Sequence, residues 1–179
     1  REIVGLEYLS QEQVPALPNQ IKRSVMDVRC TTQCGTIFIV EMQNHAATEF
    51  LKRSQFYAAH TYVNQLSPKQ THVDLKPVIL LAIANYEMFK GDPDCVTYHR
   101  MTNEKTGVSH LKDISFVFVE LEKFNKTIAE CTTLQDEWIH MFKCAQDELE
   151  IPFSTPLIKD IYTQLEEARW TKDELDQYL

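Results

Sequence analysis

An uninterrupted apolar run constrains the fold of this chain most. Residues 77–84 read PVILLAIA, and such a run is typical of a central strand that is covered on both faces. A helical pattern precedes it over residues 46–66, where apolar side chains recur every three or four positions. A second apolar strand, ISFVFVEL, follows over residues 114–121. Strands separated by a helix predict an α/β domain with a mixed central sheet flanked by helices.

Shorter elements complete this expectation. Residues 1–24 predict a helix end or an extended stretch, followed by a proline-containing connector. Residues 96–101 and 108–111 predict a hairpin that turns at residues 103–107. From Thr133 onward the pattern is helical, and one apolar stripe predicts either packing or a face for a partner helix. The members of that stripe are Leu134, Trp138, Met141, Phe142 and Ala145.

The charge is spread unevenly along the chain. The net charge is −8, and residues 131–179 carry 4 basic and 11 acidic side chains, a net of −7. A uniformly acidic chain would argue against nucleic acid, because phosphate contacts need Lys and Arg, but here the first two thirds are almost neutral. Five cysteines without a Cys-x-x-Cys spacing favour a reducing compartment, so we expect a cytoplasmic protein. The apolar runs are too short for a membrane span.

The segment SVMDVRCTTQCGTIFIVEMQN carries the most information about function. It predicts two antiparallel strands, over residues 25–31 and 36–42, joined by a three-residue loop that ends in Gly35. Pairing across this loop sets Thr32 opposite Thr36. One face of the pair is then wholly apolar and is expected to lie on the core. That face consists of Met26, Val28, Cys30, Phe38, Val40 and Met42.

The same register places two carboxylates opposite each other on the second face. Asp27 pairs with Glu41, and carboxylates about 5 Å apart on neighbouring strands repel. One interpretation is a solvent-exposed face that tolerates the repulsion, eased by Arg29. The other is a divalent-cation site, because Mg²⁺ prefers one or two carboxylates together with waters and phosphate oxygens. A cation there would polarise a phosphoryl oxygen and generate hydroxide for in-line attack.

These residues resemble a known group of nucleases. An Asp on one strand, then 13 residues, then Glu-x-Gln on the next strand and a helix is similar to the core of the PD-(D/E)xK nucleases. Six segments of the chain resemble, in the same order, the Rpn family of recombination-promoting nucleases and putative transposases. These segments are SVMDVRC, IFIVEMQ, RSQFYAAHTY, LKPVILLAI, YHRMTNEKTG and ISFVFVELEKF. The resemblance implies a restriction-endonuclease-like core over residues 1–125 and an acidic helical segment over residues 126–179. It also implies a further helix upstream of Arg1 and a longer one beyond Leu179.

The resemblance assigns the chemistry to the hairpin. Asp27 and Glu41 would hold Mg²⁺ or Mn²⁺, and the backbone carbonyl of Met42 could add a ligand. Gln43 would stand where the core motif usually has a lysine. A lysine would orient the attacking water and stabilise developing negative charge, whereas a neutral amide can position a water but contributes less electrostatically. We therefore expect Asp27, Glu41 and Gln43 to be the catalytic residues.

Basic residues near the hairpin are the expected contacts to DNA. Arg53 and Tyr57 match an Arg-x-x-x-Tyr phrase of the family, lie on one face of the predicted helix and would hold a phosphate. The alternative is a surface pair of Glu49 with Arg53 and a Tyr57 that belongs to the core. The remaining expected phosphate contacts are Lys22, Arg23, Arg29 and Lys52.

The resemblance implies a Mg²⁺-dependent deoxyribonuclease related to recombination or transposition. The alternative function is a catalytically degenerate nuclease fold that binds DNA or forms a homo-oligomer through its helical segments. Other chemistry has weaker support. His140 and Cys144 supply half of a zinc spacing without a second pair. Cys30 or Cys34 could serve in a Cys–His nucleophile, although Cys30 falls on the apolar face.

Overall fold

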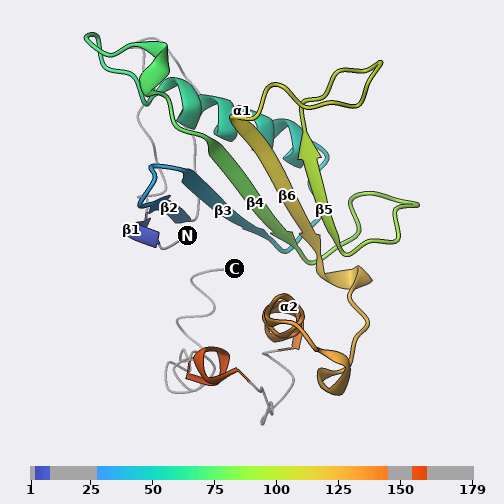
Figure 1. Cartoon of the computed structure of the whole chain (residues 1–179). Coiled ribbons are helices and arrows are strands. Elements are labelled where there is room, and N and C mark those ends of the chain that lie inside the picture. Colours follow the sequence, from blue (N-terminus) through green and yellow to red (C-terminus); the bar gives the residue numbers. More distant parts are fainter. Residues whose placement is uncertain (1–2, 9–27, 145–154, 161–179) are drawn as a thin grey trace. The chain divides into compact units, whose positions relative to one another are not determined.

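The architecture is a mixed sheet with one long helix against it. The computed structural model describes residues 3–8, 28–144 and 155–160, and the chain divides into two units, residues 1–123 and 124–179. The described residues of the first unit form a six-stranded sheet with the order β1-β2-β3-β4-β6-β5 (Figure 1). The strands are β1 (Ile3–Tyr8), β2 (Val28–Thr32), β3 (Ile37–Gln43), β4 (Val78–Ala84), β5 (Val96–Arg100) and β6 (Ile114–Glu120).

Three parallel strands form the centre of the sheet. β4 pairs with β3 on one side and with β6 on the other, both in parallel, whereas β1, β2 and β5 join in antiparallel fashion. Helix α1 (Phe50–Val63) follows β3 and returns the chain to the start of β4, which a parallel pair requires. In Figure 1, α1 lies behind the sheet. The apolar run of residues 77–84 is thus the central strand, as predicted, and the mixed α/β fold is confirmed.

The core lies between α1 and the face of the sheet that the helix covers. Its buried members, all 6% exposed or less, come from the centre of the sheet and from the inner side of the helix. They are Ile37, Ile39, Phe50, Tyr57, Ala58, Val78, Leu80, Ala82 and Phe118.

The hairpin has the predicted register but the opposite orientation. Val28 pairs with Val40 and Cys30 with Phe38, the amide of Thr32 donates to the carbonyl of Thr36 at 3.0 Å, and Gly35 adopts a φ of +82°. The expectation that the face of Phe38, Val40 and Met42 is the core was wrong, because α1 covers the face that carries Ile37, Ile39 and Glu41. Residues 37–40 of β3 are apolar on both faces, so alternation could not decide between them. Cys30 is buried, as expected, and burial raises the pKa of its thiol.

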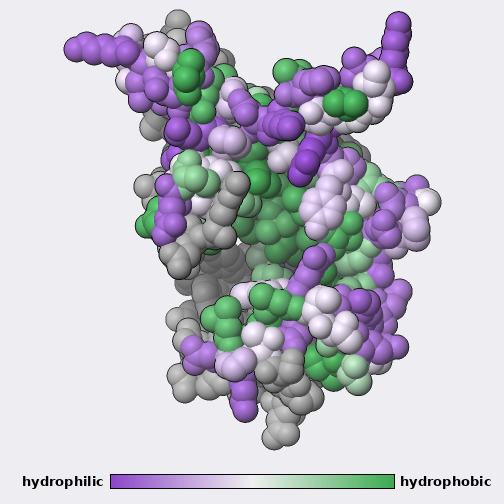
Figure 2. All heavy atoms as spheres, in the orientation of Figure 1, coloured by the Kyte–Doolittle hydropathy of each residue, from purple (hydrophilic) through white to green (hydrophobic). Residues whose placement is uncertain are grey.

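The second face of the sheet keeps an apolar surface that is in part accessible. In Figure 2, hydrophobic residues gather over the strands on the side away from α1. Phe38, Val40, Ile79 and Leu81 are half-buried there, and Met42 is 51% exposed.

Strand β5 has a different partner from the predicted one. It pairs antiparallel with β6, Tyr98 opposite Val117, and the described residues 108–111 form no strand. The predicted hairpin is therefore wrong, although its turn exists: the amides of Asn103 and Gly107 close it at 2.9 Å and 2.8 Å. The long apolar strand β6 offers a better partner than the short polar segment after the turn.

The described part of the second unit contains helices and no strand. Helix α2 (Leu134–Cys144) buries Ile139 and Met141, and residues 156–160 are helical, with Ile158 fully buried. Lys126 pairs with Asp136 across the unit at 2.7 Å. Among the described residues, no helix has the length and apolarity of a membrane span.

Candidate functional site

The polar side chains gather where the three parallel strands end. The register aligns Gln43 of β3, Ala84 of β4 and Glu120 of β6 in one row, and Glu41, Ala82 and Phe118 in the row of the same face two residues earlier. Both rows lie on the face that α1 covers. Carboxyl ends of parallel strands are a common place for ligands in α/β folds. The small side chains of Ala82 and Ala84 leave room between the two polar strand ends.

Glu41 is a carboxylate built into the edge of the core. Its side chain follows Ile37 and Ile39 on one face of β3, and the residue is only 4% exposed. Acidic side chains are rarely buried to this extent unless a cation or a set of hydrogen-bond donors compensates the charge. Asp27, its predicted opposite, lies outside the described residues, as do Lys22 and Arg23.

Gln43 is held at both ends of its amide. Nη2 of Arg53, on α1, donates to Oε1 of Gln43 at 2.5 Å, and Nε2 of Gln43 donates to the carbonyl of His45 at 3.2 Å. Because a guanidinium only donates, the atom facing Arg53 has to be the amide oxygen. The guanidinium also lies over the Phe50 ring, with its carbon 5.2 Å from the ring centre. The position at which the resemblance places the motif's lysine therefore carries an amide with a fixed orientation and a cation directly beside it.

A family comparison decides where this arrangement belongs. The family described as PD-(D/E)XK nuclease family transposase matches residues 1–179. The chain belongs to this family. No curated protein and no solved structure gave a match to the chain. Membership in a PD-(D/E)XK nuclease family makes the strand end with Glu41 and Gln43 the candidate active site, and the observed sheet is consistent with its restriction-endonuclease-like fold.

The remaining predicted residues of this PD-(D/E)XK chain have different surroundings. Arg29 is half-buried on β2, opposite Ile39 and thus on the face of Glu41. Lys52 is exposed on α1, one residue before Arg53. Tyr57 is 6% exposed and belongs to the core cluster. The structure thus brings Glu41, Gln43 and Arg53 to one strand end, while Lys52 points to solvent.

Sequence analysis missed a second buried carboxylate of this nuclease fold. Glu120, fully buried at the end of β6, accepts the backbone N–H groups of Met88 and Phe89, the latter at 2.9 Å. Its other oxygen pairs with Lys123 at 2.9 Å, and Nζ of Lys123 also donates to the carbonyl of Phe89 at 2.8 Å. The only signal in the sequence was an acid that ends an apolar strand. Glu120 fixes the turn after β4.

That turn carries Tyr86, which the sequence analysis also missed. Its hydroxyl is buried, and burial raises the pKa of Tyr86. The backbone N–H of Ala47 and the charge of Arg53 lower this pKa, whereas the charge of Glu120 raises it further. Tyr86 is therefore close enough to Arg53 and Glu120 to sense both charges.

The structure describes one of the two carboxylates that are predicted to bind a metal ion. The described residues contain no group of three or more His, Cys, Asp and Glu side chains that could hold a metal ion. The zinc arrangement around His140 and Cys144 is therefore not formed among them. Glu41 is the described carboxylate at the strand end, and the other predicted ligand, Asp27, lies outside the described residues.

Proposed function

We propose that this chain is a divalent-metal-dependent endonuclease that hydrolyses phosphodiester bonds in DNA during recombination or transposition. The observation that carries the proposal is the end of β3, where a buried carboxylate, Glu41, stands two residues before an amide, Gln43, that is held by a cation. Membership in a nuclease family supports the reaction class. The odd number of cysteines, five, and the lack of a Cys-x-x-Cys spacing support a cytoplasmic location.

The donor chemistry at this strand end fits Mg²⁺ or Mn²⁺. Both ions favour carboxylate and carbonyl oxygens, and Mg²⁺ needs only one or two carboxylates because waters and substrate phosphates complete its shell. We propose Glu41, Asp27 and the backbone carbonyl of Met42 as the ligands. A bound cation would supply Lewis acidity at the phosphoryl group and activate water.

Arg53 supplies the positive charge that a lysine at position 43 would provide and that the neutral amide of Gln43 lacks. Hydrolysis of a phosphodiester places additional negative charge on the phosphoryl oxygens, and preorganised cations stabilise it. One N–H of Arg53 is bonded to Gln43, which leaves the other terminal N–H donors of its guanidinium for a phosphate. Its Nε is buried, and no hydrogen-bond partner for it is found in the part of the chain that the structure describes.

Gln43 can orient a water or a phosphate oxygen, but its neutral amide does not neutralise negative charge. One hydrogen of its amide nitrogen is donated to the carbonyl of His45, and the second is available to a water or a phosphate oxygen. Tyr57, packed in the core one turn after Arg53, supports the helix that presents the guanidinium. Lys22, Arg23, Arg29 and Lys52 are the proposed phosphate contacts along the DNA.

A nicking assay tests the proposal. The parent should cut supercoiled plasmid DNA with Mg²⁺ or Mn²⁺ and stop in EDTA. Glu41→Gln should abolish cutting, whereas the matched variant Glu104→Gln, in an exposed turn after β5, should cut like the parent. Cutting by the Glu41→Gln protein at the parental rate would refute the assignment.

The neutral amide at position 43 favours one alternative. If the parent binds DNA but leaves plasmid intact with either metal, the chain is a degenerate nuclease fold that acts as a binding or oligomerising module. The assay therefore separates the two functions.

A further inference from the structure

A groove runs along α1 on the side away from the Gln43–Arg53 pair. It consists of two adjoining hollows that share Met101, one of about 290 Å³ and one of about 490 Å³. Helix α1 forms one wall with Leu51, Gln55 and Tyr62, and alternate residues of β6 form the floor. These floor residues are Ile114, Phe116 and Phe118.

The first hollow is lined by aromatic rings. Phe89 and His99 lie 4.9 Å apart between ring centres, and each lies 5.2 Å from Phe118. Phe89, His99 and Phe116 are only half-buried, so parts of their rings are accessible, and Leu51 is 39% exposed. Accessible rings in a hollow are platforms on which a flat apolar group can stack.

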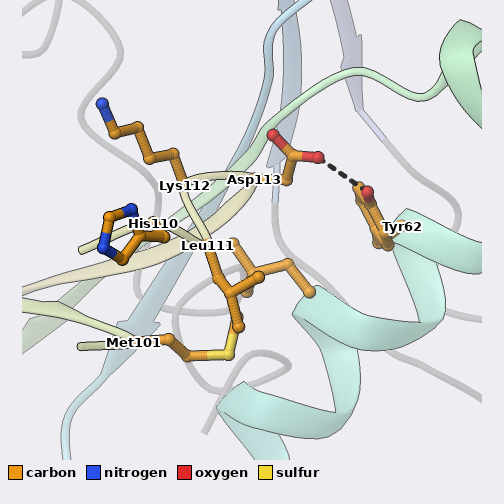
Figure 3. Close-up of a pocket in the computed structure, with 7 residues that line it drawn as sticks. Tyr62, Met101, His110, Leu111, Lys112 and Asp113 are labelled. Atoms are coloured by element: carbon orange, nitrogen blue, oxygen red, sulfur yellow. Dashed lines mark hydrogen bonds between the residues drawn. The ribbon is translucent and has the colours of Figure 1, made fainter. Parts of the chain in front are cut away.

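The second hollow has an apolar wall and a cationic rim. In Figure 3, the side chains of Met101 and Leu111 lie together beside α1, whereas His110 and Lys112 extend away from the helix. Arg100 adds a further exposed cation to the rim of the first hollow. The acid among the lining residues, Asp113, accepts the hydroxyl hydrogen of Tyr62 at 2.8 Å. The lining residues thus carry two exposed cations, Arg100 and Lys112, against the one carboxylate of Asp113, and this net positive charge favours an anionic ligand with flat apolar parts.

We propose that this groove binds unpaired nucleotides of DNA, so that the substrate of the proposed nuclease contains a single-stranded segment. The inference rests on the proposed function for the choice of DNA. Proteins that bind single strands combine a positively charged groove with aromatic platforms for successive bases, and both are present here. The floor from Ile114 to Phe118 spans about 13 Å at a strand's rise per residue, enough for a few stacked nucleotides.

The groove also lies close enough to the candidate active site for one DNA strand to reach both. Leu51 and Arg53 lie two residues apart on α1 and hence on opposite sides of the helix. A helix is about 10 Å wide, so a strand that crosses its first turn covers that distance with about three nucleotides. The unpaired segment would thus start within a few nucleotides of the scissile phosphate.

Binding of labelled oligonucleotides tests this inference. Fluorescence anisotropy of the full chain in EDTA would compare a blunt duplex, the same duplex with a short single-stranded tail, and oligothymidylate. We expect tighter binding of the tailed duplex. Phe89→Leu and Phe116→Leu should each weaken tailed-duplex and oligothymidylate binding about tenfold, the size of one lost base stack, and leave blunt duplex unchanged. Phe56→Leu, which removes an exposed ring outside the groove, is the matched control.

Arg100→Gln provides a second variant that leaves the aromatic floor intact. It should reduce the salt dependence of oligothymidylate binding by about 0.7 units of log affinity per log salt concentration, the value for one phosphate contact. Equal affinity of the parent for blunt and tailed duplex, or equal losses on both in the Leu variants, would overturn the inference. These outcomes are independent of the nicking assay, so a groove that fails the test would leave the proposed nuclease standing, and the reverse also holds.

Discussion

Two buried carboxylates stand near the ends of parallel strands on one face of the sheet, and their surroundings differ. At the end of β6, Glu120 is bonded to two backbone amides and to Lys123, all of which hold the turn after β4. At the end of β3, the cation of α1, Arg53, donates a hydrogen bond to the amide oxygen of Gln43, two residues after Glu41. Burial is therefore a poor guide to function by itself. The groups that a carboxylate organises indicate whether it maintains the fold or serves a ligand.

The largest expected effect is a difference in the free energy of unfolding between variants of the two carboxylates. Glu120→Gln keeps an oxygen acceptor for the turn but leaves the ammonium of Lys123, whose side chain is 9% exposed, without its counter-charge. Breaking such a buried pair costs about 3–5 kcal/mol in the free energy of unfolding. Glu41→Gln should change it by less than about 1 kcal/mol, because functional sites tend to trade stability for activity. Urea unfolding of both variants measures the difference.

A double variant checks the cause of that loss. Lys123→Met in the Glu120→Gln background removes the isolated charge and should restore part of the lost stability. If Glu41→Gln destabilises the protein as much as Glu120→Gln does, the contrast between the two strand ends fails.

A charge exchange sharpens the role of Arg53. Arg53→Gln should slow plasmid cleavage about 10²-fold, the size of one lost electrostatic contact to the transition state. Adding Gln43→Lys to this variant returns a cation to the same place and should recover a large part of the rate. Steady-state nicking rates of the three proteins measure both steps. A fully active Arg53→Gln protein would show that the charge beside Gln43 is not used.

Metal binding should stabilise one strand end and not the other. At ten times its Kd, Mn²⁺ should stabilise the parent by about 1.4 kcal/mol through mass action, and Glu120→Gln should respond equally. Glu41→Gln and Asp27→Asn should respond far less. Without metal, Asp27→Asn should gain about 0.2–1 kcal/mol, because it relieves the predicted repulsion across the hairpin. Thermal melts with and without Mn²⁺ measure all four proteins, and equal shifts would exclude Asp27 and Glu41 as ligands.

The smallest expected effect concerns the ion pair of the second unit, which resembles the Glu120 pair but is more open. The hydrogen bond from Lys126 holds the pKa of Asp136 below its usual value, and the Lys126 side chain is 49% exposed. Lys126→Met should therefore lower the free energy of unfolding only slightly at neutral pH. Because a lowered pKa stabilises the fold only while the carboxyl is ionised, this difference should vanish as the pH falls below about 4. Urea unfolding at neutral and acidic pH checks the sign.

The sequence predicted the elements of the fold better than their faces. The run of residues 77–84, the helix after β3 and the hairpin register all followed from apolar periodicity and from Gly35. The covered face of β3 could not follow, because Ile37, Phe38, Ile39 and Val40 are all apolar. The partner of β5 depended on a contact between strands that are distant in sequence.

The sequence likewise predicted some residues of the candidate site but not the contacts between them. The spacing of the strands and the segments that resemble the family predicted three of its residues, Glu41, Gln43 and Arg53. The bond between Gln43 and Arg53 was not, because it joins a strand to a helix across the core. Glu120 and Tyr86 had no recognisable spacing, since their roles arise only where β4 and β6 end side by side.

The cation beside Gln43 affects how the rate of the proposed DNA cleavage should vary at high pH. A lysine ammonium has a reference pKa of about 10.4, so a nuclease that relies on one loses that charge in strongly basic solution. A guanidinium remains protonated wherever a protein stays folded. Under the proposed mechanism the cation is on the helix and not on the strand, so the electrostatics of cleavage would not depend on hydroxide. Any decline of the rate at high pH would then have to arise from another group.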